Sequence, residues 1–118
     1  MRTLILNLTP HPIRLYAAER QDGLDDFDAH LHTVIEPEAT PARLATVELG
    51  TQHDGTELVE FGHRADMPPR RDGVRYVVSL PVALALVPHG RDDILVPYRE
   101  VRNAAGTVIG CRQLAQPV

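Results

Sequence analysis

A short polar strip near the amino terminus is the first place in the sequence where chemistry could sit. Asn7, Thr9 and His11 occupy alternate positions, so in an extended chain their side chains project to one side. Pro10 and Pro12 restrict the backbone there to an extended or turn conformation. Amide, hydroxyl and imidazole groups arranged in this way can contact a ligand, or they can satisfy the backbone groups of the turn. The strip therefore predicts either one wall of a ligand pocket or a polar turn.

A second group of polar side chains alternates with apolar residues in the segment DDFDAHLH: Asp26, Asp28, His30 and His32. If the segment is a strand, two carboxylates and two imidazoles share one face, and these ligands suit zinc, manganese or iron. A bound metal would lower the pKa of a water molecule and support hydrolysis. The same alternation is typical of a solvent-facing strand or loop. Neighbours on one strand face lie roughly 6.5 to 7 Å apart, so all four can bind one ion only if the chain bends.

The only cysteine, Cys111, lies in the apolar segment VIGCRQL. It could act as a nucleophile if His11 approached it, because a nearby imidazolium lowers the pKa of a thiol. A lone cysteine in an apolar strand is more typical of a small buried hydrophobic residue. The adjacent Gly110 indicates a bulge or a close approach of another backbone segment.

Arginines near the core strand and the last hairpin are candidates for binding an anion, because guanidinium groups bind phosphate and carboxylate in a bidentate manner. A helix beginning after Ser79 would add free N–H groups and a weak dipole. Local ion pairs are the alternative, since Arg91 precedes two aspartates and Arg99 precedes a glutamate. The arginines concerned are Arg75, Arg91, Arg102 and Arg112.

Composition excludes several classes of protein. All twelve basic residues are arginine, so a lysine Schiff base and a Walker-type phosphate loop are both excluded. The formal net charge of −4 argues against general nucleic-acid binding, which needs a positive surface. No apolar run is long enough to span a membrane, and polar residues come too early for a signal peptide. We therefore expect a cytoplasmic protein that has no membrane segment, internal disulfide or cofactor.

The 118 residues predict a single domain, 1–118, of the α+β class: mostly β, with a curved sheet or partial barrel and one or two short helices. The segment PVALALV, 81–87, predicts a short helix, with a continued strand as the alternative. After residue 94 we expect a strand, a break at Pro97, and a hairpin that turns at 103–106. The segments 21–28 and 65–73 are expected to be exposed loops. The strands expected before these are 4–8, 13–17, 33–36, 43–49, 56–61 and 74–80.

The opening LNLTPH, together with YVVS, RDDILVP and the pattern VR…GTVIGCR further along, resembles a group of small, mostly uncharacterised proteins of actinobacteria and their phages. The resemblance covers 4–13 and about 75–114. It carries no established activity, but it implies a role for the matching residues Asn7, Thr9, Pro10 and His11.

These observations predict a small accessory protein that is not an enzyme and binds a small anionic, nucleotide-like ligand. The expected ligand-binding residues are Asn7, Thr9, His11, Arg75, Arg91 and Arg102. One alternative is a hydrolase that uses the Asp/His group with a metal, or His11 with Cys111. The other is a protein-interaction module with exposed β edges, which includes the possibility of a homo-oligomer.

Overall fold

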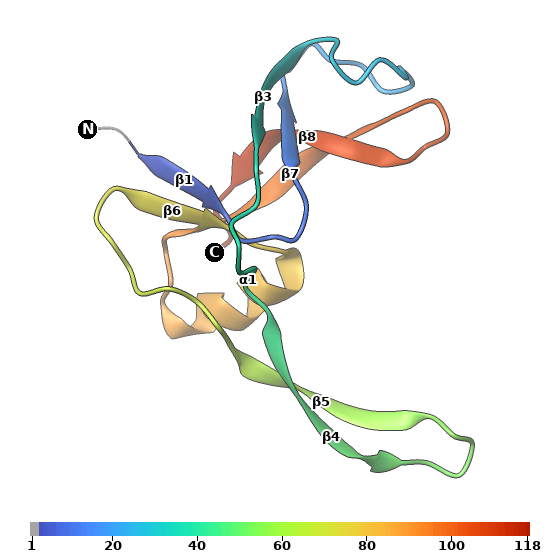
Figure 1. The fold of residues 1–118 in the computed structure, drawn as a ribbon, viewed down its shortest axis with the longest axis vertical. Coiled ribbons are helices and arrows are strands. Elements are labelled where there is room, and N and C mark those ends of the chain that lie inside the picture. Colours follow the sequence, from blue (N-terminus) through green and yellow to red (C-terminus); the bar gives the residue numbers. More distant parts are fainter. Residues whose placement is uncertain (1–2) are drawn as a thin grey trace.

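The structure is a computed structural model that describes residues 3–118, with the backbone alone for 61–65. It is mixed α+β, with mostly strands, one short α-helix and a curved sheet that does not close, as the sequence predicts (Figure 1). In chain order the elements are β1 (Leu4–Asn7), β2 (Ile13–Tyr16), β3 (Leu31–Ile35), β4 (Leu44–Thr51), β5 (Glu57–Ala65), β6 (Val74–Val77), α1 (Leu80–Leu86), a 3-10 turn (Val87–His89), β7 (Ile94–Arg102) and β8 (Val108–Ala115).

Six strands form the main sheet in the order β1-β6-β7-β8-β2-β3. The strands β1, β6 and β7 are parallel to one another, β8 is antiparallel to β7, and β3 is antiparallel to β2. A single pair, Leu15 with Cys111, joins β2 to β8 in parallel. An isolated bridge between Asn7 and Pro37 brings the end of β1 close to the chain that leaves β3. The two edges of the sheet therefore approach each other at the turn that contains the first candidate site.

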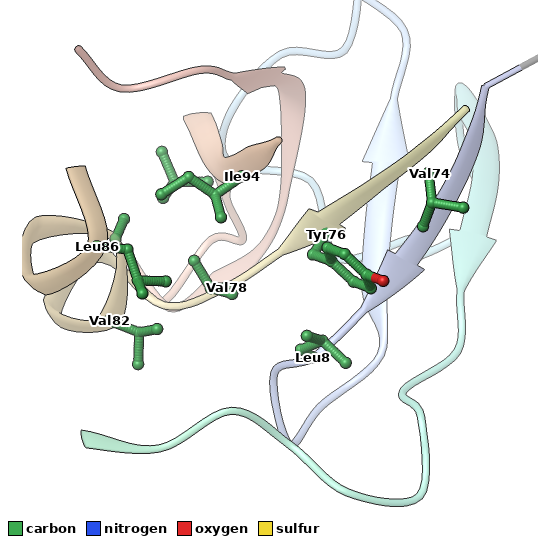
Figure 2. Close-up of a cluster of buried hydrophobic side chains, with 9 residues drawn as sticks. Leu8, Val74, Tyr76, Val78, Val82, Leu86 and Ile94 are labelled. Atoms are coloured by element: carbon green, nitrogen blue, oxygen red, sulfur yellow. The ribbon is translucent and has the colours of Figure 1, made fainter. Parts of the chain in front are cut away.

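The main hydrophobic core lies between this sheet and α1. Pro81 occupies the first turn of the helix and Gly90, at φ 77°, ends the following 3-10 turn. Val82, Ala83 and Leu86 form the buried face of the helix. Figure 2 shows this face of α1 directed toward the side chains that the strands contribute. The cluster consists of Leu8, Val74, Tyr76, Val78, Val82, Ala83, Leu86, Ile94 and Val96.

The break predicted at Pro97 is wrong, because β7 continues through it as far as Arg102. The carbonyl of Leu95 accepts a hydrogen bond from Val78 on the β6 side of the strand. Residues two apart direct their backbone groups to the same side, so the nitrogen of Pro97 also faces the β6 side, beyond the end of β6 at Val77. A proline costs no ladder hydrogen bond at that position.

The strands β4 and β5 form a separate two-stranded sheet that projects away from the main sheet (Figure 1). Its base is attached to the core through Ala42, Leu44 and Met67, which pack against the main cluster. The radius of gyration is 16.8 Å. A compact chain of this length would have a value of roughly 13.5 Å, so the projecting hairpin makes the molecule unusually extended.

Candidate functional site

The side chain of Asn7 is fully buried and lies at the centre of the turn between β1 and β2. Its Nδ2 donates hydrogen bonds to the carbonyl oxygens of His11, at 2.8 Å, and Ile35, at 3.0 Å. Its Oδ1 accepts hydrogen bonds from the backbone N–H of Thr9, at 2.9 Å, and from Thr9 Oγ1, at 2.6 Å. An asparagine side chain has two donor hydrogens and one acceptor oxygen with two lone pairs. The turn therefore uses the whole hydrogen-bonding capacity of Asn7.

The backbone around Asn7 joins three parts of the chain. The carbonyl of Asn7 accepts a hydrogen bond from the N–H of Glu38, and the carbonyl of Leu8 accepts one from Ala42. The N–H of Leu8 donates to the carbonyl of Val77. These contacts match the polar-turn interpretation of the strip. Contact of the exposed His11 or the half-buried Thr9 with a ligand stays a prediction.

The arginines expected at the ligand site lie in three separate places, each with a partner of its own. Arg75, on β6, donates a hydrogen bond to Gln116 Oε1 at 2.8 Å. Arg102, at the end of β7, pairs with Glu100 at 2.8 Å and also donates to the carbonyl of Gly106. Arg91 lies just before β7, whose nine residues span about 26 Å. Arg91 and Arg102 therefore lie at opposite ends of this strand, and their joint role with Asn7 stays a prediction.

Arg91 forms the local ion pair that the sequence allows. Its Nε and Nη2 contact the two carboxylate oxygens of Asp93 at 2.8 and 2.9 Å, and Nη2 also donates to the carbonyl of Pro68. Hydrogen bonds from Arg91 hold the pKa of Asp93 below its usual range. Both side chains are mostly shielded from solvent, at 17% and 10% exposure. The second local pair expected from the sequence, Arg99 with Glu100, does not form. Glu100 pairs with Arg102 instead, and Arg99 lies over the ring of Tyr98.

Asp93→Asn is expected to reduce stability at neutral pH by about 1–2 kcal/mol. Folding lowers the pKa of Asp93. The stabilisation that the Asp93 carboxylate gives to the folded state is therefore fully present above its unfolded pKa of about 3.9, and it is lost as the pH falls through the lower pKa of the folded state. Urea unfolding at pH 7 and pH 3 should therefore show the difference between wild type and variant narrowing in acid. The control is Asp92→Asn, which removes the carboxylate of the exposed pair with Arg70 and should change the free energy of unfolding little. A difference that is constant with pH would contradict this assignment.

The strand on which the metal-site hypothesis depends does not form across the Asp/His group, and the segment 21–28 is exposed and irregular, as the loop prediction expects. Asp26 lies in irregular chain, Asp28 and His30 lie in a turn, and only His32 lies in β3. Asp26 Oδ1 accepts a hydrogen bond from the N–H of Asp28 at 2.9 Å, while His30 has a φ of 57°. Within the described part of the chain, no three His, Cys, Asp or Glu side chains are grouped to hold a metal ion.

A buried arginine organises these turns. Arg20 is 1% exposed, and its guanidinium donates to the carbonyl oxygens of Asp26, Ala29 and Leu24 at 2.5, 2.7 and 3.0 Å. It also lies 4.8 Å from the ring centre of Tyr16. Its Nε finds no partner among the residues that the structure describes. Because the backbone of the turns wraps around this group, the side chains of Asp26 and Asp28 face outward.

Arg112 is held by the same region. It donates to the carbonyl of Arg20 through Nε and Nη2, at 2.8 and 2.6 Å, and to the carbonyl of Glu100 at 2.8 Å. It also contacts Asp22 at 3.0 Å. The backbone N–H of Arg102 and the Arg112 guanidinium lower the pKa of Asp22. A shallow hollow of about 480 Å³ lies beside Arg112, where β2 and β8 diverge, with Tyr16 and His32 in its lining. The charge of Arg112 is thus already engaged within the protein.

The structure places Cys111 inside the sheet. It is 1% exposed, and burial raises the pKa of its thiol. A Cβ added at Gly110 would lie 2.5 Å from the carbonyl oxygen of Arg14, which confirms the close backbone approach expected there. At the start of α1, Ser79 makes no capping hydrogen bond through its side chain, and the seven-residue helix has only a weak dipole.

Cys111 should be almost inert toward thiol reagents in the folded protein. With excess Ellman's reagent at pH 8, we expect labelling slowed at least about a hundredfold relative to protein in denaturant, because both burial and the raised pKa reduce the accessible thiolate. Cys111→Ala supplies the blank. Rapid native labelling would contradict a buried thiol and favour the nucleophile interpretation.

The β4–β5 hairpin displays the most concentrated set of exposed apolar side chains on regular structure. Val47, Leu49, Leu58 and Val59 retain 54%, 60%, 48% and 42% of their accessible surface. Val47 lies opposite Glu60, and Val59 lies opposite Glu48. Directly paired residues share a face, so each face of the hairpin combines aliphatic and acidic side chains. The sequence predicts both strands, but alternation alone does not indicate that they stand apart from the core.

No family model, no curated protein and no solved structure matched the chain. The resemblance to the actinobacterial and phage proteins therefore stays a prediction. Among the described residues, no helix has the length and apolar character needed to cross a membrane.

Proposed function

We propose that the protein is an interaction module without catalytic activity, which binds another protein through the β4–β5 hairpin. The observation that carries this proposal is the exposure of four large aliphatic side chains on a hairpin that stands apart from the core. Large exposed apolar patches on folded proteins mark binding surfaces, and a hairpin with two free edges also offers backbone groups for strand addition.

The remaining candidate groups support a module without catalysis. The Asn7 side chain is fully used by its turn, Arg91 is paired with Asp93, and the Cys111 thiol is buried with a raised pKa. A nucleophile needs the opposite conditions, namely access and a lowered pKa. The hairpin, in contrast, has side chains and backbone edges that the fold leaves open.

Site-specific photocrosslinking in the cells that produce the protein tests this proposal. A photoreactive amino acid replaces Leu49 on the hairpin or, as the matched control, Val108 on β8, which is 44% exposed. We expect one dominant protein adduct from position 49 that is absent from position 108. Equal or absent adducts at the two positions would overturn the hairpin as the binding surface.

A further inference from the structure

The hairpin proposed as the binding surface is acidic over most of its length. The span 44–60 contains Glu48, Asp54, Glu57 and Glu60 and no arginine. The rest of the chain contains twelve acidic residues and twelve arginines, so its formal charges cancel. The whole hairpin, 44–65, also contains Arg64, so its formal net charge is −3.

The edges of the hairpin are open and unusually unprotected. Among the residues that the structure describes, β4 and β5 pair only with each other, so each has one free edge. Folded proteins usually protect free edges with lysine, proline or inward-pointing charge. The span 44–60 contains neither lysine nor proline, and its charges are all negative. Such an edge disfavours pairing with another acidic strand and favours pairing with a positively charged strand.

Resting on the proposed function, we infer that the partner contributes an extended segment of aliphatic residues interleaved with lysine or arginine, which pairs with the hairpin as a third strand. At the edge of β4 its aliphatic side chains would lie beside Val47 and its cations, on the opposite face, beside Glu48. Glu60 lies on the face of Val47, one strand further away, and adds to the negative charge of the hairpin. Backbone hydrogen bonds supply affinity in this mode of recognition, and the side chains supply specificity.

Other occupants fit the charge and shape of the hairpin less well. A second copy would bring like charges together on neighbouring strands, which is destabilising. Nucleic acids and anionic membranes carry the same sign of charge as the hairpin. Membrane insertion also needs an apolar tip, whereas the tip, 51–56, is polar and is held by hydrogen bonds from the Thr56 N–H and hydroxyl to Asp54.

Three model peptides test the inference with the full-length protein. Each has twelve residues and alternates valine with lysine, threonine or glutamate. Fluorescence anisotropy at low salt gives the affinities, and hydrogen exchange shows whether hairpin amides become protected. We expect the lysine peptide to bind about tenfold or more tightly than the threonine peptide, with the difference shrinking at high salt.

Charge reversal on the hairpin provides the decisive comparison. The variant E48K/E60K should transfer the preference from the lysine peptide to the glutamate peptide, because the formal charge of the hairpin, 44–65, changes from −3 to +1. The control E19K/E38K changes the net charge equally at exposed positions outside the hairpin and should keep the wild-type preference.

The outcomes separate this inference from the proposed function. Equal protection of the hairpin by the lysine and threonine peptides would overturn the basic partner and leave the hairpin as a binding surface. Failure of every peptide to protect the hairpin amides would overturn strand addition. The crosslinking comparison tests independently whether the hairpin is a binding surface. Concentration-dependent dimerisation through the hairpin in sedimentation experiments would replace the basic partner with a second copy.

Discussion

Asn7→Ala is expected to lower the free energy of unfolding by about 3–5 kcal/mol. The substitution removes both donors that satisfy the carbonyls of His11 and Ile35, and it removes the acceptor used by Thr9. These groups lie where β1, β2 and the end of β3 meet, so the loss affects the whole sheet rather than one turn. Urea unfolding followed by circular dichroism measures the change.

Two further variants give the Asn7 experiment its controls. Asn103 also caps a turn through its Oδ1, but in the exposed β7–β8 connection, so Asn103→Ala should cost about 1 kcal/mol. Asn7→Asp keeps the acceptor for Thr9 but places a carboxylate against two carbonyl oxygens. This variant should be destabilised at pH 7 and partly recover in acid as the carboxyl is protonated. A cost for Asn7→Ala no larger than that for Asn103→Ala would contradict the central role of Asn7.

Arg20→Met is expected to cost about 3–4 kcal/mol, although methionine fills much of the same volume. Exchange of a buried ion pair for apolar residues is often neutral, because both charges leave together. Arg20 differs, since its acceptors are the backbone carbonyls of Leu24, Asp26 and Ala29, which remain after the substitution. Hydrogen exchange should show 22–30 losing protection before the rest of the sheet.

The matched control for Arg20 is Arg99→Met. Arg99 is exposed, and its guanidinium lies 5.9 Å from the ring centre of Tyr98, so this variant should change stability by less than about 0.5 kcal/mol. If Arg20→Met were as stable as Arg99→Met, the turns would hold their conformation without the buried guanidinium.

Most strands could be predicted from the sequence because their signals are local. The valine-rich segment at β6, the alternation in β4 and β5 and the turn at 103–106 all predict the observed elements, as Pro81 and Gly90 do for α1. The break at Pro97 was predicted wrongly because the tolerance of a strand for proline depends on which neighbour its nitrogen faces. That information belongs to the sheet order, which the local sequence does not contain.

The candidate sites were less predictable because their chemistry depends on long-range contacts. Nothing near Arg20 indicates that it is buried, since the segment around it is acidic and polar. The partner of Asn7 at Ile35 lies 28 residues away. The apolar residues of the hairpin have the same sequence pattern as those of a packed strand. Only the structure shows that these side chains lie outside the core and are exposed.

In the function that we propose, the apolar side chains of the hairpin serve a partner rather than the fold. The most direct test is the free energy of unfolding of the variant V47S/L49S/L58S. We predict a change below about 1 kcal/mol, because these side chains lie outside the core and retain about half of their accessible surface. The control Val78→Ser, at a fully buried position, should cost about 3 kcal/mol or more. A loss of similar size in the hairpin variant would show that the fold itself needs these residues, and it would contradict the claim.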